Sequence, residues 1–293
     1  MSGAQAEPMA DLRLPRELVD AEVASALAED LGLAGDITSE ATIAAGARAS
    51  GVIATRKAGV VAGVQLAEAA FKALDADARV DVLIADGGRL KPGDIIARIA
   101  GNARALLGAE RVALNFLGHL SGVATLTRAY VDRIAGTRAR IIDTRKTTPG
   151  LRAFEKHAVR AGGGLNHRFG LFDAILVKDN HIAAAGGIGK AMAGIRSRAG
   201  HMVKVEVEVT TLAELDEALA HAPDAVLLDN MPVPMLKAAV AKVAGRTVTE
   251  ASGGVTLDTV RQIAETGVDL ISVGALTHSA PNLDVGLDFD PAG

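Results

Sequence analysis

The chain has 293 residues, of which 49% are hydrophobic, enough for one large core or two modest ones. Its net charge of -4 and its 2% aromatic content argue against a general nucleic-acid binder, which would present a basic surface and aromatic stacking platforms. The chain has no cysteine, which excludes a disulfide framework and makes the cytoplasm the expected compartment.

Two features of the sequence argue against secretion and against a membrane partner. The first residues, MSGAQAEPMADLRLP, lack a basic segment followed by an apolar one, so we expect no signal peptide and a frayed tail. The longest apolar stretch, residues 112–131, is broken by Asn115, His119 and Arg128, which would be costly inside lipid. We therefore interpret this stretch as a buried helix that does not enter a membrane.

The first part of the chain mixes helices and strands. Residues 15–31 carry apolar side chains close to helical spacing, and Gly32 can end the helix. The following GDITSEAT contains Asp, Ser and Thr side chains. These side chains either cap a helix or line a site, or they only satisfy the backbone groups of their own loop. Later patterns predict a strand, a helix, a pair of β-rich runs and a long helix, at residues 50–55, 65–74, 80–101 and 104–134. We expect a small α+β domain over residues 1–110.

From residue 140 onward, strands and helices alternate strictly. Six apolar strand candidates begin near Ile141, Ala174, Val203, Ala225, Val248 and Leu270. Such a run predicts an α/β fold whose parallel sheet either closes into a TIM-like barrel or stays open and doubly wound. An open sheet would concentrate its chemistry at one switch point, whereas here polar residues follow nearly every strand. We favour an incomplete TIM-like α/β barrel, with its leading helix, over residues 111–280, followed by a C-terminal segment at 281–293.

A group of basic side chains follows the first two of these strands: Arg145, Lys146, His167, Arg168 and Lys178. Cations that follow buried strands, instead of lying on exposed helix surfaces, indicate an anion site more than a solvated basic face. Arginine pairs bidentately with carboxylate or phosphate, and lysine supplies a compact point charge. We therefore expect a ligand with several negative charges.

Acidic side chains end two later strands. The segment VKVEVEVT places Glu206 and Glu208 on one face of a strand, with Lys204 toward the same side. Glu208 is nearer to the strand end, whereas Glu206 either supports it or pairs with Lys204. Asp229 ends the strand AVLLD. Together, Glu208 and Asp229 can hold ribose hydroxyls, or Mg2+ through water.

Glycines follow the last two strands. Ser252-Gly253-Gly254 precedes a helix expected to begin near Thr256, and Gly274 stands in a similar position. Backbone N–H groups exposed by glycine beside a helix N-terminus bind anions, and in barrels such sites follow the last strands. Glycine also serves tight turns, but two such loops in consecutive units predict a phosphate site.

Three motifs, DTRKTTPGLR, KHAVRAGGGLNHRFGL and KDNHI, resemble the signature of the quinolinate phosphoribosyltransferase family. The similarity extends from EDLGLAGDITS near the N-terminus to GALTHSAP near the C-terminus. The resemblance implies a pentosyltransferase of NAD biosynthesis, which converts quinolinate and phosphoribosyl pyrophosphate into nicotinate mononucleotide, pyrophosphate and CO2 with Mg2+. It also implies a homodimer with shared active sites, with a higher homo-oligomer as an alternative.

The resemblance further implies roles for individual residues. The pyridine dicarboxylate would be held by Arg145, His167, Arg168 and Lys178, together with Arg111 from a neighbouring subunit. The catalytic residues would be Lys146, near both substrates, and the ribose and Mg2+ acids Glu208 and Asp229. The rest of the substrate-binding set would be Thr144 and the phosphate loops, Ser252, Gly253 and Gly254 in one and Val273, Gly274 and Ala275 in the other.

Two other functions compete with this one. A paralogous phosphoribosyltransferase could use another acceptor, as in the paralogues associated with molybdate-transport genes. A non-catalytic sensor of phosphate metabolites could use the same barrel, but it would not need both acidic strand ends together with the dicarboxylate cations.

Overall fold

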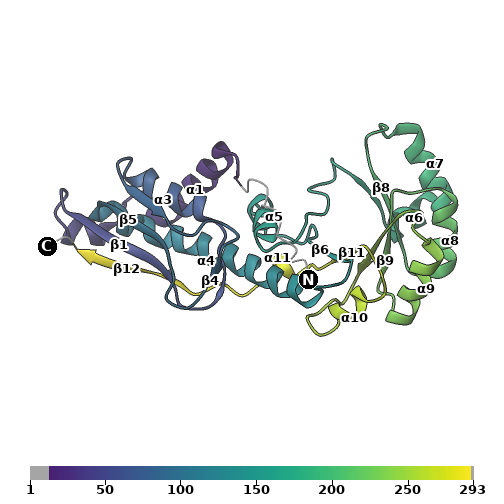
Figure 1. Ribbon diagram of the computed structural model, residues 1–293. Helices are drawn as coiled ribbons and strands as arrows, with labels where there is room; N and C mark the ends of the chain where they lie inside the picture. Colours follow the sequence, from purple (N-terminus) through teal and green to yellow (C-terminus); the bar gives the residue numbers. More distant parts are fainter. Residues whose placement is uncertain (1–12, 292–293) are drawn as a thin grey trace. The chain divides into compact units, whose positions relative to one another are not determined.

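The computed structural model describes residues 13–291 of the chain (Figure 1). Most of the N-terminal tail that we expected to fray therefore lies outside the described residues. Close packing divides the chain into two compact units. The first contains residues up to Leu126, Ala153–Gly163 and the chain from Ala280 onward, and the second contains Thr127–Arg152 and Gly164–Ser279. Within residues 13–291, no helix combines the length and hydrophobicity that crossing a bilayer requires.

The first unit contains an antiparallel sheet of four strands in the order β12-β1-β5-β3. These strands are β1 (Arg48–Thr55), β3 (Arg79–Val82), β5 (Ile95–Asn102) and β12 (Val285–Pro291), and β2 (Gly59–Val60) pairs with β4 (Arg89–Leu90). The helices are α1 (Arg16–Leu31), α2 (Ile37–Thr42), α3 (Val64–Leu74), α5 (Arg152–Ala161) and the long α4 (Ala103–Arg133), which continues into the second unit. This mixture confirms the predicted α+β character of the N-terminal part.

The sequence patterns located most of these elements, and two local features explain their ends. Helix α1 ends at Leu31, and Gly32 caps it with a φ of 52°. Residues with a side chain rarely adopt such a positive φ, so glycine is favoured at this position. In GDITSEAT, Asp36 accepts hydrogen bonds from the backbone N–H groups of Thr38 and Ser39, at 3.1 and 3.0 Å. The side-chain and backbone hydrogen bonds of Ser39 lower the pKa of Asp36. The segment thus caps the short helix α2.

Strand β12 was not predicted. Its residues pair with β1 in an antiparallel register that runs from Ala49 opposite Pro291 to Thr55 opposite Val285. The boundary predicted at residue 110 falls inside α4, and β12 belongs to the segment predicted at 281–293. The division of the chain into domains at 1–110 and 111–280, with a C-terminal segment at 281–293, stays a prediction.

The second unit contains the predicted parallel sheet. Its strands are β6 (Arg140–Ile142), β7 (Ile175–Val177), β8 (Val205–Val209), β9 (Ala225–Asp229), β10 (Val248–Ser252) and β11 (Leu270–Ser272). The order β6-β11-β10-β9-β8-β7 places the last strand beside the first and has no switch point, which fits a barrel and not a doubly wound sheet. The barrel is incomplete, because within residues 13–291 the two edge strands, β6 and β7, do not pair with each other. The edge of β6 instead makes an isolated bridge from Ile142 to Leu165.

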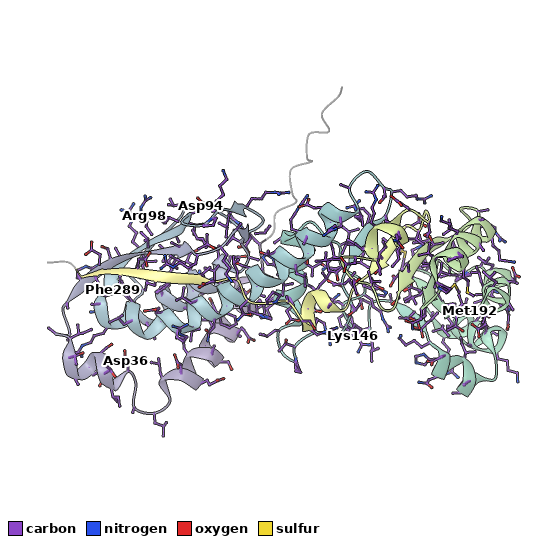
Figure 2. The ribbon with its side chains drawn as sticks, turned by 90° about the horizontal axis from the view of Figure 1, so that it is seen from below. Asp36, Asp94, Arg98, Lys146, Met192 and Phe289 are labelled. Carbon is purple, nitrogen blue, oxygen red and sulfur yellow. The ribbon has the colours of Figure 1, made fainter. Side chains whose placement is uncertain are left out.

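Helices alternate with the strands of this sheet or follow them. They are α6 (Asp179–Ala185), α7 (Ile188–Arg198), α8 (Leu212–Ala220), α9 (Val233–Val243), α10 (Val260–Ala264) and α11 (Ala275–His278). Figure 1 shows α7, α8 and α9 along one face of the strands. Met192 of α7, labelled in Figure 2, is only 3% exposed. Because alternate residues of a strand point to opposite faces, buried Val207 and Val209 leave Glu206 and Glu208 on the other face.

Candidate functional site

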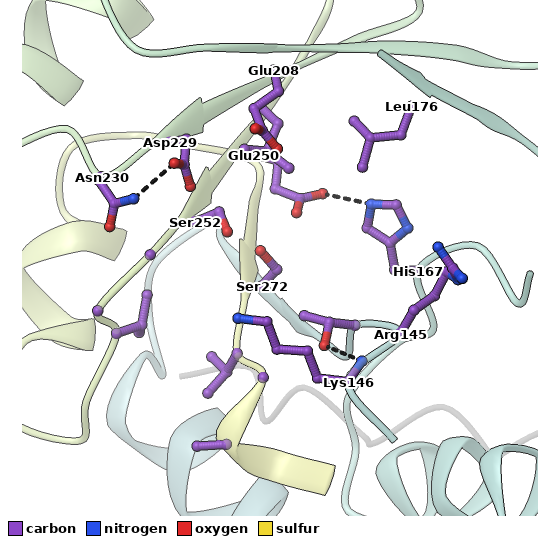
Figure 3. A pocket seen from close by; sticks show the side chains of 18 of the residues that line it. Arg145, Lys146, His167, Leu176, Glu208, Asp229, Asn230, Glu250, Ser252 and Ser272 are labelled. Carbon is purple, nitrogen blue, oxygen red and sulfur yellow. Dashed lines mark hydrogen bonds and ion pairs between the residues drawn. The ribbon is translucent and has the colours of Figure 1, made fainter. Parts of the chain in front are cut away.

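A pocket of about 680 Å³ opens at the C-terminal ends of the strands of the second unit (Figure 3). It is lined by every residue that the sequence predicted for a site in this unit, namely Thr144, Arg145, Lys146, His167, Arg168, Lys178, Glu208, Asp229, Ser252, Gly253, Gly254, Val273, Gly274 and Ala275. The remaining predicted residue, Arg111, lies on α4 in the first unit, and its side chain is exposed.

The cations of the pocket are only partly neutralised by the protein. The Nζ of Lys178 lies 2.6 Å from the Oε2 of Glu208, but the Nε of Arg145 is buried and has no hydrogen-bond partner among the described residues. Burial lowers the pKa of Arg168, and the nearby charge of Arg145 lowers it further. Since a buried donor without an acceptor is costly, this part of the pocket favours an anionic ligand.

Not every acidic side chain of the pocket pairs with a cation, and Asp229 lies away from Arg145 and His167. Figure 3 shows Asp229 and Asn230 on one side and Arg145 and His167 on the other. The Nδ2 of Asn230 donates to the Oδ2 of Asp229 at 2.7 Å, which orients this carboxylate. A side chain on Gly253 would place its Cβ 2.0 Å from the Oδ1 of Asn230, so only glycine fits beside this pair.

The two glycine loops line the pocket, and the helices after them are short. Gly253 and Gly254 have φ angles of 94° and 61°, and the helix expected near Thr256 begins only at Val260. The reason is local, because the side chains and backbone of Thr256 and Thr259 bond to each other in a turn. Helix α11, after Gly274, has four residues. A phosphate here would be bound by turn N–H groups more than by a helix end.

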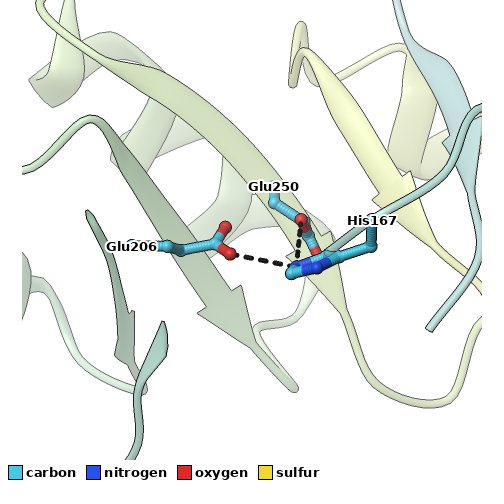
Figure 4. Close-up of side chains that lie close together, drawn as sticks. All are labelled: His167, Glu206 and Glu250. Carbon is cyan, nitrogen blue, oxygen red and sulfur yellow. Dashed lines mark hydrogen bonds and ion pairs between the residues drawn. The ribbon is translucent and has the colours of Figure 1, made fainter. Parts of the chain in front are cut away.

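A buried cluster of three titratable side chains lies deeper in the second unit (Figure 4). The Nε2 of His167 is 3.0 Å from the Oε2 of Glu206 and 3.5 Å from the Oε2 of Glu250. Lys204, the other partner considered for Glu206, instead pairs with Asp224 at 2.6 Å. That alternative is wrong because Lys204 precedes β8 and its side chain is exposed.

The loop that carries His167 is held by a buried carboxylate that follows β6. The Oδ1 of Asp143 accepts the backbone N–H of His167 at 2.9 Å, and its Oδ2 accepts the Nδ2 of Asn166 at 2.6 Å. Asp143 is fully buried. It was visible in the motif DTRK, but its role in positioning the loop was not predicted.

Sequence reasoning missed several residues that line the pocket: Leu176, Leu227, Asn230, Glu250, Val255, Ser272 and His278. Glu250 had a usable signal, since it stands two residues before Ser252 on the same strand and therefore faces the same side. Ser272 ends β11 in the same way that Asp229 ends β9. The apolar residues carried no signal that separates them from core residues.

Both halves of the chain match known family models. Residues 123–288 match the C-terminal domain of quinolinate phosphoribosyl transferase, and residues 36–121 match its N-terminal domain. A carboxylating nicotinate-nucleotide pyrophosphorylase from Mycobacterium leprae is 47% identical over 269 residues, which cover 90% of this chain and 94% of the relative. A probable carboxylating nicotinate-nucleotide pyrophosphorylase from Bacillus subtilis is 44% identical over 260 residues, covering 89% of each chain.

Solved structures of similar proteins share the fold. NadC from Streptococcus pyogenes superimposes with a TM-score of 0.92 and 42% identity, over 96% of this chain and 99% of that one. The nicotinate-nucleotide pyrophosphorylase from Francisella tularensis has a TM-score of 0.91 and 38% identity, over 98% and 100% of the two chains. These relatives extend over almost the whole chain, so both units are accounted for.

Asp143→Ala tests whether this carboxylate holds the loop of His167. The substitution leaves two donors without their acceptor, so we predict a loss of about 2 to 4 kcal/mol in the free energy of unfolding, measured in urea. The control is Asp216→Ala, which removes an exposed carboxylate paired with Lys242 at 2.8 Å and should cost less than about 1 kcal/mol. An equal, small loss in both variants would show that Asp143 does not have this role.

Proposed function

The chain belongs to the quinolinate phosphoribosyltransferase family, and we propose that it transfers the phosphoribosyl group of phosphoribosyl pyrophosphate to quinolinate. The products are nicotinate mononucleotide, pyrophosphate and CO2. The observation that carries this proposal is the pocket in which Arg145, Arg168 and Lys178 meet Glu208 and Asp229. The names of the Mycobacterium leprae and Bacillus subtilis relatives support it.

Quinolinate fits the basic side of the pocket by charge. Its two adjacent carboxylates need at least two cationic partners, and the unpaired Nε of Arg145 offers one of them. Arg168 donates through Nη1 to the backbone O of Ala174 at 3.0 Å, which fixes its guanidinium beside that of Arg145. A dicarboxylate between them would relieve the repulsion of the two like charges.

The donor substrate is assigned to the remaining wall. Glycine loops 252–254 and 273–275 supply N–H groups for the 5′-phosphate, and Lys146 lies beside the second loop, since a Cβ on Gly274 would be 3.0 Å from its Cδ. The carboxylates of Glu208 and Asp229 are assigned to the ribose hydroxyls. Their oxygen donors also fit Mg2+ held through water, which when bound neutralises the charge of pyrophosphate.

The reaction requires no covalent bond between the protein and a substrate. As the bond from C1 to pyrophosphate breaks, positive charge develops on the ribose, and Glu208 and Asp229 stabilise it while Lys146 holds the leaving group. The ring nitrogen of quinolinate then forms the new bond to C1. The ring is now cationic, so it accepts the electron pair that CO2 leaves behind, and a proton replaces CO2 on the ring.

We predict that quinolinate is a substrate and nicotinate is not. A monocarboxylate leaves buried cations without partners, and we expect at least about a 100-fold lower kcat/KM for nicotinate. The measurement is nucleotide formation from labelled phosphoribosyl pyrophosphate with each acceptor. Equal turnover of both would refute the assignment of quinolinate, and absence of turnover with any pyridine would favour a sensor.

We also propose that a second copy of this chain completes the site. Arg111 and Asn115 are exposed one turn apart on α4, on either side of the buried run Val112, Ala113 and Leu114. In the second unit, the loop next to Arg168 exposes Phe169, Leu171 and Phe172 by 40%, 73% and 81%. Exposed aromatic side chains in a chain with only 2% aromatics support an interface between subunits.

Subunit exchange tests whether Arg111 acts across that interface. Arg111→Ala and Lys178→Ala dimers should each be inactive, and mixing them should restore activity. In a hybrid, the barrel with intact Lys178 receives Arg111 from the other subunit, so one of its two sites is whole. Activity that stays absent, although mass spectrometry shows hybrid dimers, would contradict the proposal.

A further inference from the structure

We propose that Glu250 is a positioning residue whose protonated carboxyl, acting through Glu206, fixes His167 and the start of the Arg168 segment at the floor of the pocket. The activity part of this inference rests on the proposed function, whereas the stability part does not. The proposed reaction requires no contact of Glu206 or Glu250 with a substrate. Both lie deeper than Glu208 and Asp229, and they are 9% and 1% exposed.

The three side chains come from different elements and meet in the interior. Glu206 lies on β8, Glu250 on β10, and His167 on the loop after residue 163. Among the described residues, no lysine or arginine forms an ion pair with either carboxyl, and the Oε1 of Glu250 is buried without a hydrogen-bond partner. His167 is thus the base that contacts both acids.

The hydrogen bonds of His167 determine its protonation. The backbone N–H of Arg168 donates to the Nδ1 of His167 at 2.6 Å, so this nitrogen is an acceptor. A neutral imidazole has one donor and one acceptor, so the Nε2 carries the hydrogen and donates to Glu206 at 3.0 Å. The uncharged ring therefore cannot neutralise two carboxylates.

A proton on Glu250 resolves this conflict. Two ionised carboxyls in a buried cluster with one neutral ring would be strongly unfavourable. Burial is the first cause that raises the pKa of Glu250 to about 8, and the negative charge of Glu206 is the second. A positive charge on His167 would lower this pKa, but the accepting Nδ1 of His167 favours the neutral ring. The O–H of protonated Glu250 supplies the further hydrogen-bond donor that the cluster needs, and it donates to the carboxylate of Glu206.

The other groups around the cluster do not remove the need for this proton. On the neighbouring strands, Glu250 is in register with Leu227 of β9 and Leu270 of β11, and Ser272 of β11 offers a hydrogen bond. The charge of Arg168 interacts with that of Glu206, and Arg145 interacts with Arg168. The ion pair of Lys178 with Glu208 lies at the strand ends and is already neutral.

Loss of the proton has a consequence for the substrate site. Above about pH 8, Glu250 loses its proton and becomes a second carboxylate beside Glu206. The repulsion between the two charges displaces Glu206, which accepts the hydrogen bond from His167. The ring of His167 also accepts a hydrogen bond from the backbone N–H of Arg168. Movement of the ring therefore weakens this bond and shifts Arg168, which is proposed to bind the acceptor. The effect should appear in the KM for quinolinate and not in that for phosphoribosyl pyrophosphate.

The test compares Glu250→Gln with Glu250→Leu. The amide of glutamine donates like a protonated carboxyl and cannot ionise, so Glu250→Gln should keep kcat/KM at pH 7 within about threefold and lose the alkaline fall near pH 8 that the unaltered protein shows. Glu250→Leu, which lacks the donor, should raise the KM for quinolinate at least about tenfold. As a control, Glu265→Gln changes an exposed carboxylate on Arg261 and should keep the unaltered pH profile.

Thermal unfolding decides the inference even if quinolinate is not the substrate. The raised pKa of Glu250 in the folded state means that its stabilising contribution is full below the unfolded value of about 4.5 and is lost as pH rises through about 8. As the pH rises from 5 to 8, the melting temperature of Glu250→Gln should therefore increase relative to that of the unaltered protein.

Two outcomes would overturn the proposal. One is the same pH dependence of stability in the unaltered protein and in Glu250→Gln, which would show that Glu250 does not titrate in this range. The other is a tightly bound divalent metal in the purified protein that Glu250→Gln lacks, which would make His167, Glu206 and Glu250 a metal centre. Absence of turnover alone, with the predicted stability difference present, would refute only the proposed function.

Discussion

Six parallel strands end at one edge of their sheet, and this single constraint brings together side chains that lie between residues 144 and 278 of the sequence. Gathering cations in one place is costly unless something neutralises them. The protein does so in part, through Lys178 with Glu208, and leaves the Nε of Arg145 buried without a partner. The remaining imbalance favours a ligand with several negative charges, so the fold and the charge pattern specify the same chemistry.

Support for this pocket comes from side chains that do not reach a ligand. Asp143 holds the loop of His167, and Glu206 accepts from the ring of that histidine. Asn230 orients Asp229, and only glycine at position 253 leaves room for it. Reactive groups need such partners because small displacements of a catalytic or binding side chain weaken every contact it makes.

Much of the barrel and its rim could be predicted from the sequence. Apolar runs followed by polar clusters located the six strands, and polar residues at or just beyond the strand ends proved to line one pocket. Strand β12 was missed because its pairing with β1 joins segments more than 200 residues apart, and no local pattern reports such a contact. Glu250 was missed because a carboxylate inside a strand looks like a solvent-facing residue until its neighbours are known. The delayed start of α10 depends on side-chain bonds of Thr256 and Thr259 that propensity alone does not predict.

We propose that the unpaired Nε of Arg145 binds a carboxylate of the acceptor. The most direct measurement is the Kd of quinolinate, by calorimetry, for the unaltered protein and for Arg145→Gln, with the exposed Arg196→Gln as control. Arg145→Gln should weaken binding at least about 30-fold, while the control should bind like the unaltered protein. An unchanged Kd for Arg145→Gln would show that Arg145 does not hold the acceptor.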